Sequence, residues 1–199
     1  MNKKVYKVND YVLEFLVAQG IKQVFVITGG AIAFLMDGFH GRKDIKYIPV
    51  NHEQGAAMMG DAYSRLGPGL SACMVTSGPG ATNLLTGIGC AWFDSIPTLY
   101  ISGQVNTYEQ KGGIPGTENA RQVGFQETDI VSIVKPLTKY ATMVRKLDDL
   151  RYELEKSVYI AKSGRPGPVL LDIPMDLQRI PCDPKSMKPF VPPTTKPYR

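Results

Sequence analysis

The chain has 199 residues, of which 43% are hydrophobic and 21% are charged, and its formal net charge at pH 7 is +5. This length and composition are typical of one globular domain that buries a core, and they exclude a fibrous or disordered chain. No arginine-rich stripe interleaved with aromatic residues accompanies the positive charge, so no nucleic-acid partner is expected.

The cysteines and the first residues of the chain indicate the cellular compartment of the protein. Cys73, Cys90 and Cys182 are far apart and lack the spacing of a metal site or a disulfide framework. They indicate reduced thiols and hence a cytoplasmic protein. The first residues, MNKKVYKVNDYV, contain no apolar core of signal-peptide length. The longest uncharged run, residues 66–93, holds six glycines and two prolines, so we expect no membrane association.

Taken in chain order, predicted helices and strands alternate. Apolar spacing predicts a helix over residues 9–19, which Gly20 would end. Strands are predicted at 23–27, 45–50, 70–76, 98–102, near 138–144 and at 168–173. Further helices are predicted at 31–40, 53–65, 79–93 and 147–163, and residues 103–128 are predicted to be largely irregular.

Alternation of helices with near-continuous apolar strands is typical of a parallel sheet that is covered on both faces. We therefore predict an α/β fold, with a doubly wound six-stranded parallel sheet and helices on both faces, spanning residues 1–180. Residues 181–199 contain six prolines and no helical period, which predicts a Pro-rich linker towards a missing middle domain. A linker with no second domain after it suggests a fragment of a longer protein.

Four unusual segments follow predicted strands. They are TGGA (28–31), NHEQ (51–54), TSGPGATN (76–83) and SGQV (102–105). Ligands of open α/β sheets bind at the carboxyl ends of the strands, so we expect these segments to meet at one edge. The glycines permit either a close approach to a ligand or simply a tight turn. TSGPGATN has neither the lysine of a P-loop nor the G-x-G-x-x-G pattern.

Glu53, directly after the second strand, has two interpretations. Asn51 could cap the following helix, with Gln54 three residues on as in a capping box, and an acid in the first turn suits the helix dipole. Alternatively, Glu53 is a catalytic acid at the ligand edge. His52 is interpreted as a hydrogen-bonded structural residue. Asp172, within the apolar strand PVLLDIP, would need hydrogen-bond partners if buried. No Ser/His/Asp set and no metal cluster is evident, so we predict no metal ligand in the chain.

Together, these motifs resemble the N-terminal pyrimidine-binding domain of thiamine-diphosphate-dependent enzymes, and among them the acetolactate synthase large-subunit family. The matching motifs are, in order, HEQGAA, GDAYSR, TSGPGATNLLTGI, DSIP, SGQV, GFQETDIV and GRPGPVLLDIP. The resemblance covers about residues 4–180, and seven ordered matches make it specific.

The resemblance implies a catalytic role for Glu53. It matches the family's glutamate that contacts N1′ of the cofactor's aminopyrimidine and so helps to remove the C2 proton of the thiazolium. The resemblance also implies cofactor contacts, by Gly29, Gly30, Ala31, Glu53, Thr76, Pro79, Gly80, Asn83 and Gln104. Phe125 and Gln126 match a Phe-Gln pair at the active-site entrance, and so are implied to line the substrate pocket.

The family's other properties follow as further implications. The cofactor would be thiamine diphosphate, with Mg²⁺ bound by a domain absent from this chain, and FAD is possible in the parent protein. The parent would be a 2-keto acid decarboxylase or carboligase, a lyase or transferase. Its partners would be the diphosphate-binding domain of another subunit, within a homo-oligomeric dimer or tetramer. The chain alone is expected to be inactive.

Three features depart from the family. Ile27 and Thr28 stand where a Tyr-Pro pair usually precedes the glycines, Met58 stands in place of a second histidine, and residues 106–123 form a longer segment. Acetolactate as the product is therefore not implied. Two alternative functions stay open. One is a separate pyrimidine-binding subunit of a split decarboxylase. The other is a non-catalytic nucleotide-binding Rossmann-like module, against which the missing acidic residue for a ribose argues.

Overall fold

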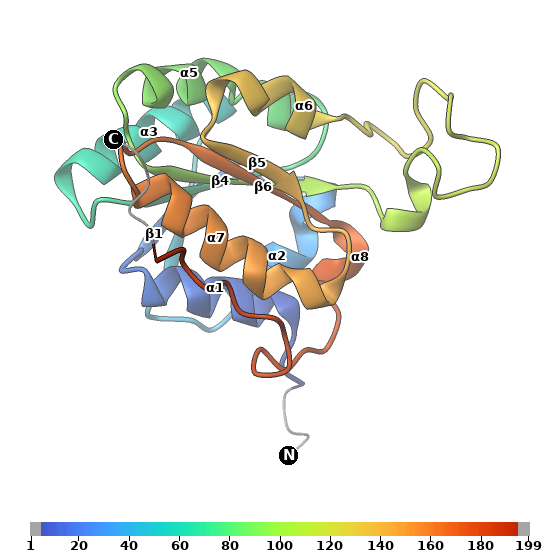
Figure 1. The fold of residues 1–199 in the computed structure, drawn as a ribbon, viewed down its shortest axis with the longest axis horizontal. Helices are drawn as coiled ribbons and strands as arrows, with labels where there is room; N and C mark the ends of the chain where they lie inside the picture. The colour runs from blue at the N-terminus through green and yellow to red at the C-terminus, as the bar shows by residue number, and fades with distance from the viewer. Residues whose placement is uncertain (1–4, 195–199) are drawn as a thin grey trace.

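The computed structural model describes residues 5–194 and shows a central sheet between two layers of helices (Figure 1). The strands are β1 (Gln23–Val26), β2 (Lys46–Pro49), β3 (Ser71–Val75), β4 (Thr98–Gln104), β5 (Tyr140–Met143) and β6 (Val169–Pro174). The α-helices are α1 (Val8–Ala18), α2 (Ala33–Asp37), α3 (Glu53–Leu66), α4 (Pro79–Thr82), α5 (Leu85–Phe93), α6 (Ile130–Val134), α7 (Leu150–Lys162) and α8 (Met175–Gln178). The 3₁₀ turns are η1 (Gly30–Ile32), η2 (Thr107–Glu109), η3 (Lys135–Leu137) and η4 (Leu147–Asp149).

The sheet confirms the predicted fold class. Its six strands lie in the order β2-β1-β3-β4-β6-β5, and every neighbouring pair is parallel. The chain moves from β1 outward to β2, then returns to β3 and builds the other half, which is the doubly wound arrangement. Three of the four inner strands, β3, β4 and β6, are buried along their whole length, as is typical of a parallel sheet covered on both faces.

Alternate side chains of the inner strands enter two separate cores. Val24, Val26 and Met74 pack under α1, α2 and α7, whereas Phe25 and Cys73 pack under α3, α5 and α6. Figure 1 shows these helix groups on opposite faces of the sheet. Within residues 5–194, no helix has the length and apolar character needed to cross a bilayer.

Small residues bring α3 very close to its neighbours. A Cβ on Gly87 of α5 would lie 2.2 Å from Cβ of Ala57, and a Cβ on Gly60 would lie 2.6 Å from Sγ of Cys73. The side chain that glycine lacks at these two positions would overlap with the neighbouring element. A Cβ on Gly55, one turn before Met59, would meet no atom within 4 Å. Small residues of α3 therefore serve helix packing at Ala57 and Gly60, and leave open space at Gly55.

The structure corrects three predicted helices and adds one. The helix predicted at residues 31–40 begins as the 3₁₀ turn η1 and continues as α2 only to Asp37. The helix predicted at residues 79–93 is divided, because Leu84 N donates to Ala81 O at 3.2 Å in a tighter, 3₁₀-type step between α4 and α5. The helix predicted at 147–163 begins as the 3₁₀ turn η4. Helix α8 was not predicted, since its four residues are too short to show periodicity.

The first part of the predicted linker lies on the domain surface. Lys7 and Pro181 form an isolated antiparallel bridge, and Met187 is only 3% exposed in the core beneath α1 and α7. The ring of Phe190 packs against Tyr152 and Tyr159 of α7, with centroid distances of 5.5 and 5.3 Å. Residues 195–199 lie outside the described part of the chain. The linker and the domain boundary at residue 180 therefore stay predictions, with residues 181–190 in contact with the domain.

Candidate functional site

Glu53 is the first residue of α3, directly after the carboxyl end of β2. The residue before it, His52, is the N-cap of the helix, and its Nδ1 accepts a hydrogen bond from Gln54 N at 3.1 Å. The predicted cap at Asn51 is therefore wrong, because the extended backbone of His52 places an imidazole acceptor at the helix start. The structural interpretation of His52 is confirmed. The Glu53 carboxylate takes no part in this cap.

The Glu53 side chain is almost enclosed, with a relative exposure of 8%. Its Oε2 accepts a hydrogen bond from Asn83 Nδ2 at 2.9 Å. Within residues 5–194, Oε1 accepts no hydrogen bond. This oxygen is nevertheless not fully buried, so solvent can reach it. A Cβ added to Gly80 would lie 3.5 Å from this Oε1. A nearly buried carboxylate thus keeps one oxygen free beside a glycine, and such an oxygen has unused capacity for a ligand.

Thr76 joins the two Gly-rich turns to this carboxylate. A Cβ at Gly29 would lie 2.5 Å from Cβ of Thr76, and a Cβ at Gly80 would lie 2.7 Å from its Cγ2, so neither position accepts a larger residue without a shift. The Thr76 hydroxyl oxygen also accepts a hydrogen bond from Ala31 N at 3.2 Å. TGGA and TSGPGATN therefore meet beside Glu53, as their positions after β1 and β3 predicted. Gly30 is exposed and has open space around it.

Ala31 is held from its other side by a residue that sequence reasoning missed. Gln178, which is fully buried, donates from Nε2 to Ala31 O at 2.7 Å and to Ile173 O at 2.8 Å. Its Oε1 accepts a hydrogen bond from Leu35 N at 3.3 Å. No local pattern could indicate this role, since Gln178 and Ala31 are 147 residues apart in the sequence.

Gln104 lies in a different environment from Glu53. It ends β4, is 4% exposed, and donates from Nε2 to Thr128 O and to Asp172 Oδ2, both at 2.9 Å. Its Oε1 accepts from Val105 N at 3.1 Å. Among the described residues, none of these hydrogen bonds reaches the Glu53 cluster. The cofactor contact predicted for Gln104 stays a prediction, and its amide is already fully occupied.

The remaining predicted residues lie around the second Gly-rich turn. Pro79 is exposed at the start of α4. Phe125 is 83% exposed, so its ring projects from the surface. Gln126 touches the turn, because a Cβ at Gly78 would lie 2.7 Å from the Gln126 Cβ. The structure thus brings Gln126, but not the ring of Phe125, into the packing around the turn that leads to Glu53.

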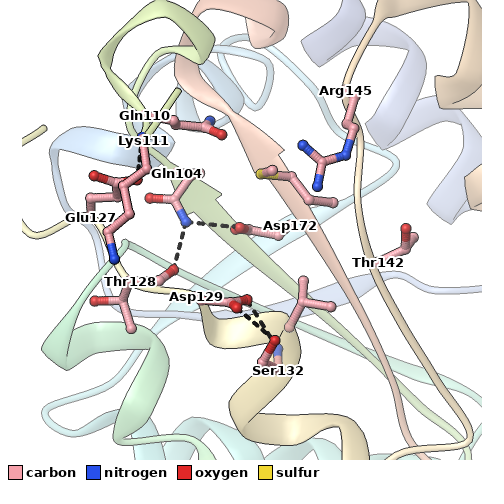
Figure 2. Close-up of a pocket in the computed structure, with 12 residues that line it drawn as sticks. Gln104, Gln110, Lys111, Glu127, Thr128, Asp129, Ser132, Thr142, Arg145 and Asp172 are labelled. Atoms are coloured by element: carbon pink, nitrogen blue, oxygen red, sulfur yellow. Dashed lines mark hydrogen bonds between the residues drawn. The ribbon is translucent and has the colours of Figure 1, made fainter. Parts of the chain in front are cut away.

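A second polar cluster occupies the ends of β4 and β6. Asp172 is 1% exposed, and its Oδ1 accepts from Ser102 Oγ at 2.7 Å while its Oδ2 accepts from Gln104. Burial is the main cause that raises the pKa of Asp172 to about 7, and it outweighs the lowering effect of the two hydrogen bonds. Figure 2 shows Gln104 and Asp172 on the wall of a cavity of about 410 Å³. The partners that this buried acid was predicted to need are therefore present.

The two clusters differ in what they can do. The Glu53 cluster offers an unpaired carboxylate oxygen beside glycines, which suits a flat heteroaromatic ring that carries a ring nitrogen. The Asp172 cluster has both carboxylate oxygens paired. Among residues 5–194, no three His, Cys, Asp or Glu side chains gather in a way that could hold a metal ion.

Comparison with known proteins gives a consistent result. Residues 6–133 match the family model described as "Thiamine pyrophosphate enzyme, N-terminal TPP binding domain". The chain is 39% identical over 92% of its length to the acetolactate synthase isozyme 3 large subunit of Escherichia coli, covering 29% of that protein. It is 41% identical over 84% of its length to the acetolactate synthase large subunit of Haemophilus influenzae, and 42% identical over 83% to that of Pyropia yezoensis, covering 27% of each. The chain thus spans less than a third of these relatives.

Proposed function

The chain belongs to the thiamine pyrophosphate enzyme family, as an N-terminal TPP-binding domain related to the acetolactate synthase large subunit, and from this premise we propose that it forms the pyrimidine-binding half of a cofactor site. The parent enzyme would be a 2-keto acid decarboxylase or carboligase. The observation that carries the proposal is the nearly buried Glu53, whose Oε1 is unpaired beside Gly80.

Glu53 is the proposed catalytic residue. Its free Oε1 would share a proton with N1′ of the aminopyrimidine, while Asn83 holds Oε2 and so fixes the plane of the carboxylate. When bound, thiamine diphosphate supplies an acidic carbon and an electron sink for the decarboxylation of a 2-keto acid. Glu53 is only 8% exposed, so little water surrounds its carboxylate and a contact with a bound ring would be strengthened.

The Gly-rich turns form the proposed cradle of the pyrimidine ring. Gly29 and Gly80 pack on Thr76, so the backbone approaches the site without side chains in the way. Ala31 is fixed by Thr76 on one side and Gln178 on the other, which orders the TGGA turn before a ligand arrives. Pro79 starts α4 and Asn83 ends it, so this short helix delivers the amide that orients Glu53. Phe125 and Gln126 are proposed at the entrance, on the substrate side.

This half-site would need a partner. We propose that Mg²⁺ and the diphosphate are held by a diphosphate-binding domain of another subunit. An apolar face on α3 and α5 is available for association, since Met58 is 44%, Phe93 72% and Leu66 90% exposed. Met59, Tyr63 and Leu66 of α3 line an apolar hollow of about 360 Å³. Exposed apolar patches of this kind mark association surfaces. FAD binding by the parent protein stays a prediction.

The proposal is tested by exchange of the C2 hydrogen of thiamine diphosphate, followed by NMR. The chain is assayed with a diphosphate-binding domain supplied by the rest of its own polypeptide or by a separate subunit. Glu53→Gln removes the shared proton but keeps the side-chain shape, so we expect exchange to slow by roughly 100- to 10,000-fold with the fold retained. Asp61→Asn is the matched control, because Asp61 lies on the same helix but pairs with Arg65.

The control should exchange at the wild-type rate. Equal rates in the wild type and in Glu53→Gln would remove the catalytic role of Glu53. A wild-type protein that accelerates no exchange but binds nucleotides would favour the Rossmann-like module. A partner domain encoded in its own reading frame would identify a split enzyme instead of a fragment.

The half-site itself is tested with the chain alone. Because the phosphates would have no metal anchor, calorimetry with thiamine diphosphate and Mg²⁺ should show only weak binding. Sub-micromolar affinity would show that this chain carries a complete site. In sedimentation, the chain should self-associate at high concentration, and Phe93→Glu should weaken that association, since Phe93 is 72% exposed on the apolar face.

A further inference from the structure

The segment that carries Phe125 and Gln126 has a single hydrogen-bonded tether to the sheet. Among the described residues, the hydrogen bond from Gln104 Nε2 to Thr128 O is the one that joins residues 120–129 to a strand. The other hydrogen bonds of the segment are local or reach the preceding part of the same loop, where Glu127 accepts from Lys111 N and Val123 N, both at 2.8 Å. Figure 1 shows this long connection extending beyond the end of the sheet.

The tether is anchored to a second strand by a buried acid. Gln104 Nε2 also donates to Asp172 Oδ2 at 2.9 Å (Figure 2). Asp172 Oδ1 in turn accepts a hydrogen bond from Ser102 Oγ at 2.7 Å. The Gln104 amide has two N–H groups and one carbonyl oxygen, and all three are used. The amide therefore has one orientation, which is fixed by β4 on one side and β6 on the other.

The tethered segment presses Gln126 onto the turn that precedes α4. Gln126 has a φ of 59°, a left-handed conformation that is unfavourable for a residue with a side chain. A Cβ at Gly78, which has a φ of 61°, would lie 2.7 Å from Gln126 Cβ and 3.1 Å from Gln126 O. Such strained conformations persist only where surrounding contacts hold them. The tether at Thr128, two residues on, is one such contact.

The contacts continue from the turn to the proposed catalytic residue. Gly78 is the N-cap of α4, and this helix carries Gly80, which faces Glu53 Oε1, and leads to Asn83, which donates to Glu53 Oε2. A continuous chain of contacts therefore links Asp172, Gln104, Thr128, Gln126 and Gly78 to Glu53.

We propose that Gln104 and Asp172 are positioning residues, which hold residues 124–128 so that Gln126 stays packed on the Gly78 turn beside the Glu53 site. This inference rests on the proposed function for its effect on the cofactor. The position of the loop can be tested without the cofactor. In this role Gln104 acts through Thr128 and Gln126.

The test compares Gln104→Leu with Ser102→Ala. Both remove one hydrogen bond from buried Asp172, but only Gln104→Leu also cuts the tether to Thr128. Amide hydrogen exchange of the peptide spanning residues 122–130, measured by mass spectrometry, should become about tenfold faster in Gln104→Leu, from the loss of a buried hydrogen bond. Ser102→Ala should leave this peptide at the wild-type rate. Equal acceleration in both variants would overturn the proposal, because a merely structural role predicts it.

A conservative substitution of Asp172 should preserve the hydrogen bond between Gln104 and Thr128. In Asp172→Asn, the amide oxygen can accept from Gln104 and the amide nitrogen can donate to Ser102 Oγ, so the tether survives. This variant should keep the wild-type exchange rate at residues 122–130, and a loosened loop would contradict the proposal. If Gln104→Leu does not fold, Gln104→Asn withdraws the amide by one methylene and takes its place in the comparison.

The cofactor arm separates the two proposals. With a diphosphate-binding domain present, Gln104→Leu should raise the thiamine diphosphate concentration for half-maximal C2 exchange several-fold, with the maximal rate within twofold of the wild type. An unchanged half-maximal concentration, with a loosened loop, would show that the loop does not serve the cofactor. A wild type without cofactor-dependent exchange would defeat the proposed function, while amide exchange would still decide whether Gln104 holds the loop.

Discussion

Two buried carboxylates lie at the same edge of the sheet and have opposite surroundings. Glu53, after β2, is 8% exposed and has one hydrogen bond, from Asn83, which leaves Oε1 unpaired within the described residues. Asp172, at the end of β6, is 1% exposed and has each oxygen paired, with Ser102 and Gln104. The pairing of the oxygens, more than the depth of burial, distinguishes an acid that can serve a ligand from one that holds the fold.

The largest effect expected in this comparison concerns the stability of Asp172→Asn. Burial raises the pKa of Asp172 from its ordinary value of 3.8 to about 7, so the wild type loses stability as the pH rises from about 4 to about 7. The loss amounts to about 4 kcal/mol at 1.36 kcal/mol per pKa unit, and the uncharged amide of the variant avoids it while keeping the hydrogen bonds.

Urea denaturation between pH 4 and pH 8 measures the difference in unfolding free energy between Asp172→Asn and the wild type. Asp172→Asn should match the wild type near pH 4 and exceed it by an increasing margin up to about pH 7. Thr82→Ala, which removes no titratable group, should show no such divergence. A constant difference between Asp172→Asn and the wild type across this range would mean that Asp172 ionises as freely as an exposed acid.

The next effect concerns the close packing of Gly80 against Thr76 and Glu53. In Gly80→Ala the new methyl group would lie 2.7 Å from Thr76 Cγ2 and 3.5 Å from Glu53 Oε1. We expect a stability loss of roughly 1–3 kcal/mol from overpacking, measured by urea denaturation, together with weaker thiamine diphosphate binding. Adding Thr76→Ser removes the clashing Cγ2, so the double variant should recover stability but not cofactor binding. If the double variant recovered both stability and cofactor binding, the space beside Gly80 would not be part of the binding site.

A smaller effect on cofactor binding is expected from loss of Asn83, the hydrogen-bond partner of Glu53. Asn83→Ala removes the hydrogen bond to Oε2 and should weaken cofactor binding by roughly 3- to 10-fold, in line with about 1 kcal/mol for one hydrogen bond. Thr82→Ala is the neighbouring control, since the Thr82 hydroxyl donates to Pro79 O and not to Glu53. Calorimetry with the assembled enzyme distinguishes them. Similar losses in both variants would mean that α4 stability, and not carboxylate orientation, governs binding.

The smallest expected effect tests backbone strain at Gln126, with Ser95, before the amino end of β4, as the control. Gln126 and Ser95 are the non-glycine residues with positive φ in the described chain, at 59° and 62°. Replacement of either by glycine should stabilise the domain by about 1 kcal/mol or less in thermal unfolding, because the strain is relieved. Gln126→Gly alone should also weaken cofactor binding in the assembled enzyme. If Ser95→Gly also weakened cofactor binding, the loss in Gln126→Gly could not be attributed to the loop of residues 124–128.

Much of the fold and part of the site follow from local sequence. Apolar strands separated by helical periods predicted all six strands within two residues at each end, and the rule of carboxyl strand ends placed Glu53 beside TGGA and TSGPGATN. These features depend on neighbouring residues, so a pattern reveals them. The division of the helix at Leu84 depends on one tightened hydrogen bond, which no periodicity indicates.

The partners of polar side chains could not be predicted in this way. Asp172, which accepts a hydrogen bond from the Gln104 amide, is one such partner and lies 68 residues away in sequence. His52 caps α3 in place of Asn51, because ring geometry and an extended backbone decide which acceptor reaches the helix start. Such choices among several suitable donors and acceptors are made by tertiary packing.

The buried amide of Gln178 has a consequence for biosynthesis. It fastens the TGGA turn through Ala31 O, although the turn is translated 147 residues earlier. While the 147 residues between Ala31 and Gln178 are translated, the glycine turn therefore lacks the hydrogen bond from Gln178. The TGGA turn gains this hydrogen bond only after α8 leaves the ribosome. A translational pause before Gln178 would therefore prolong the time during which the turn is not held in place.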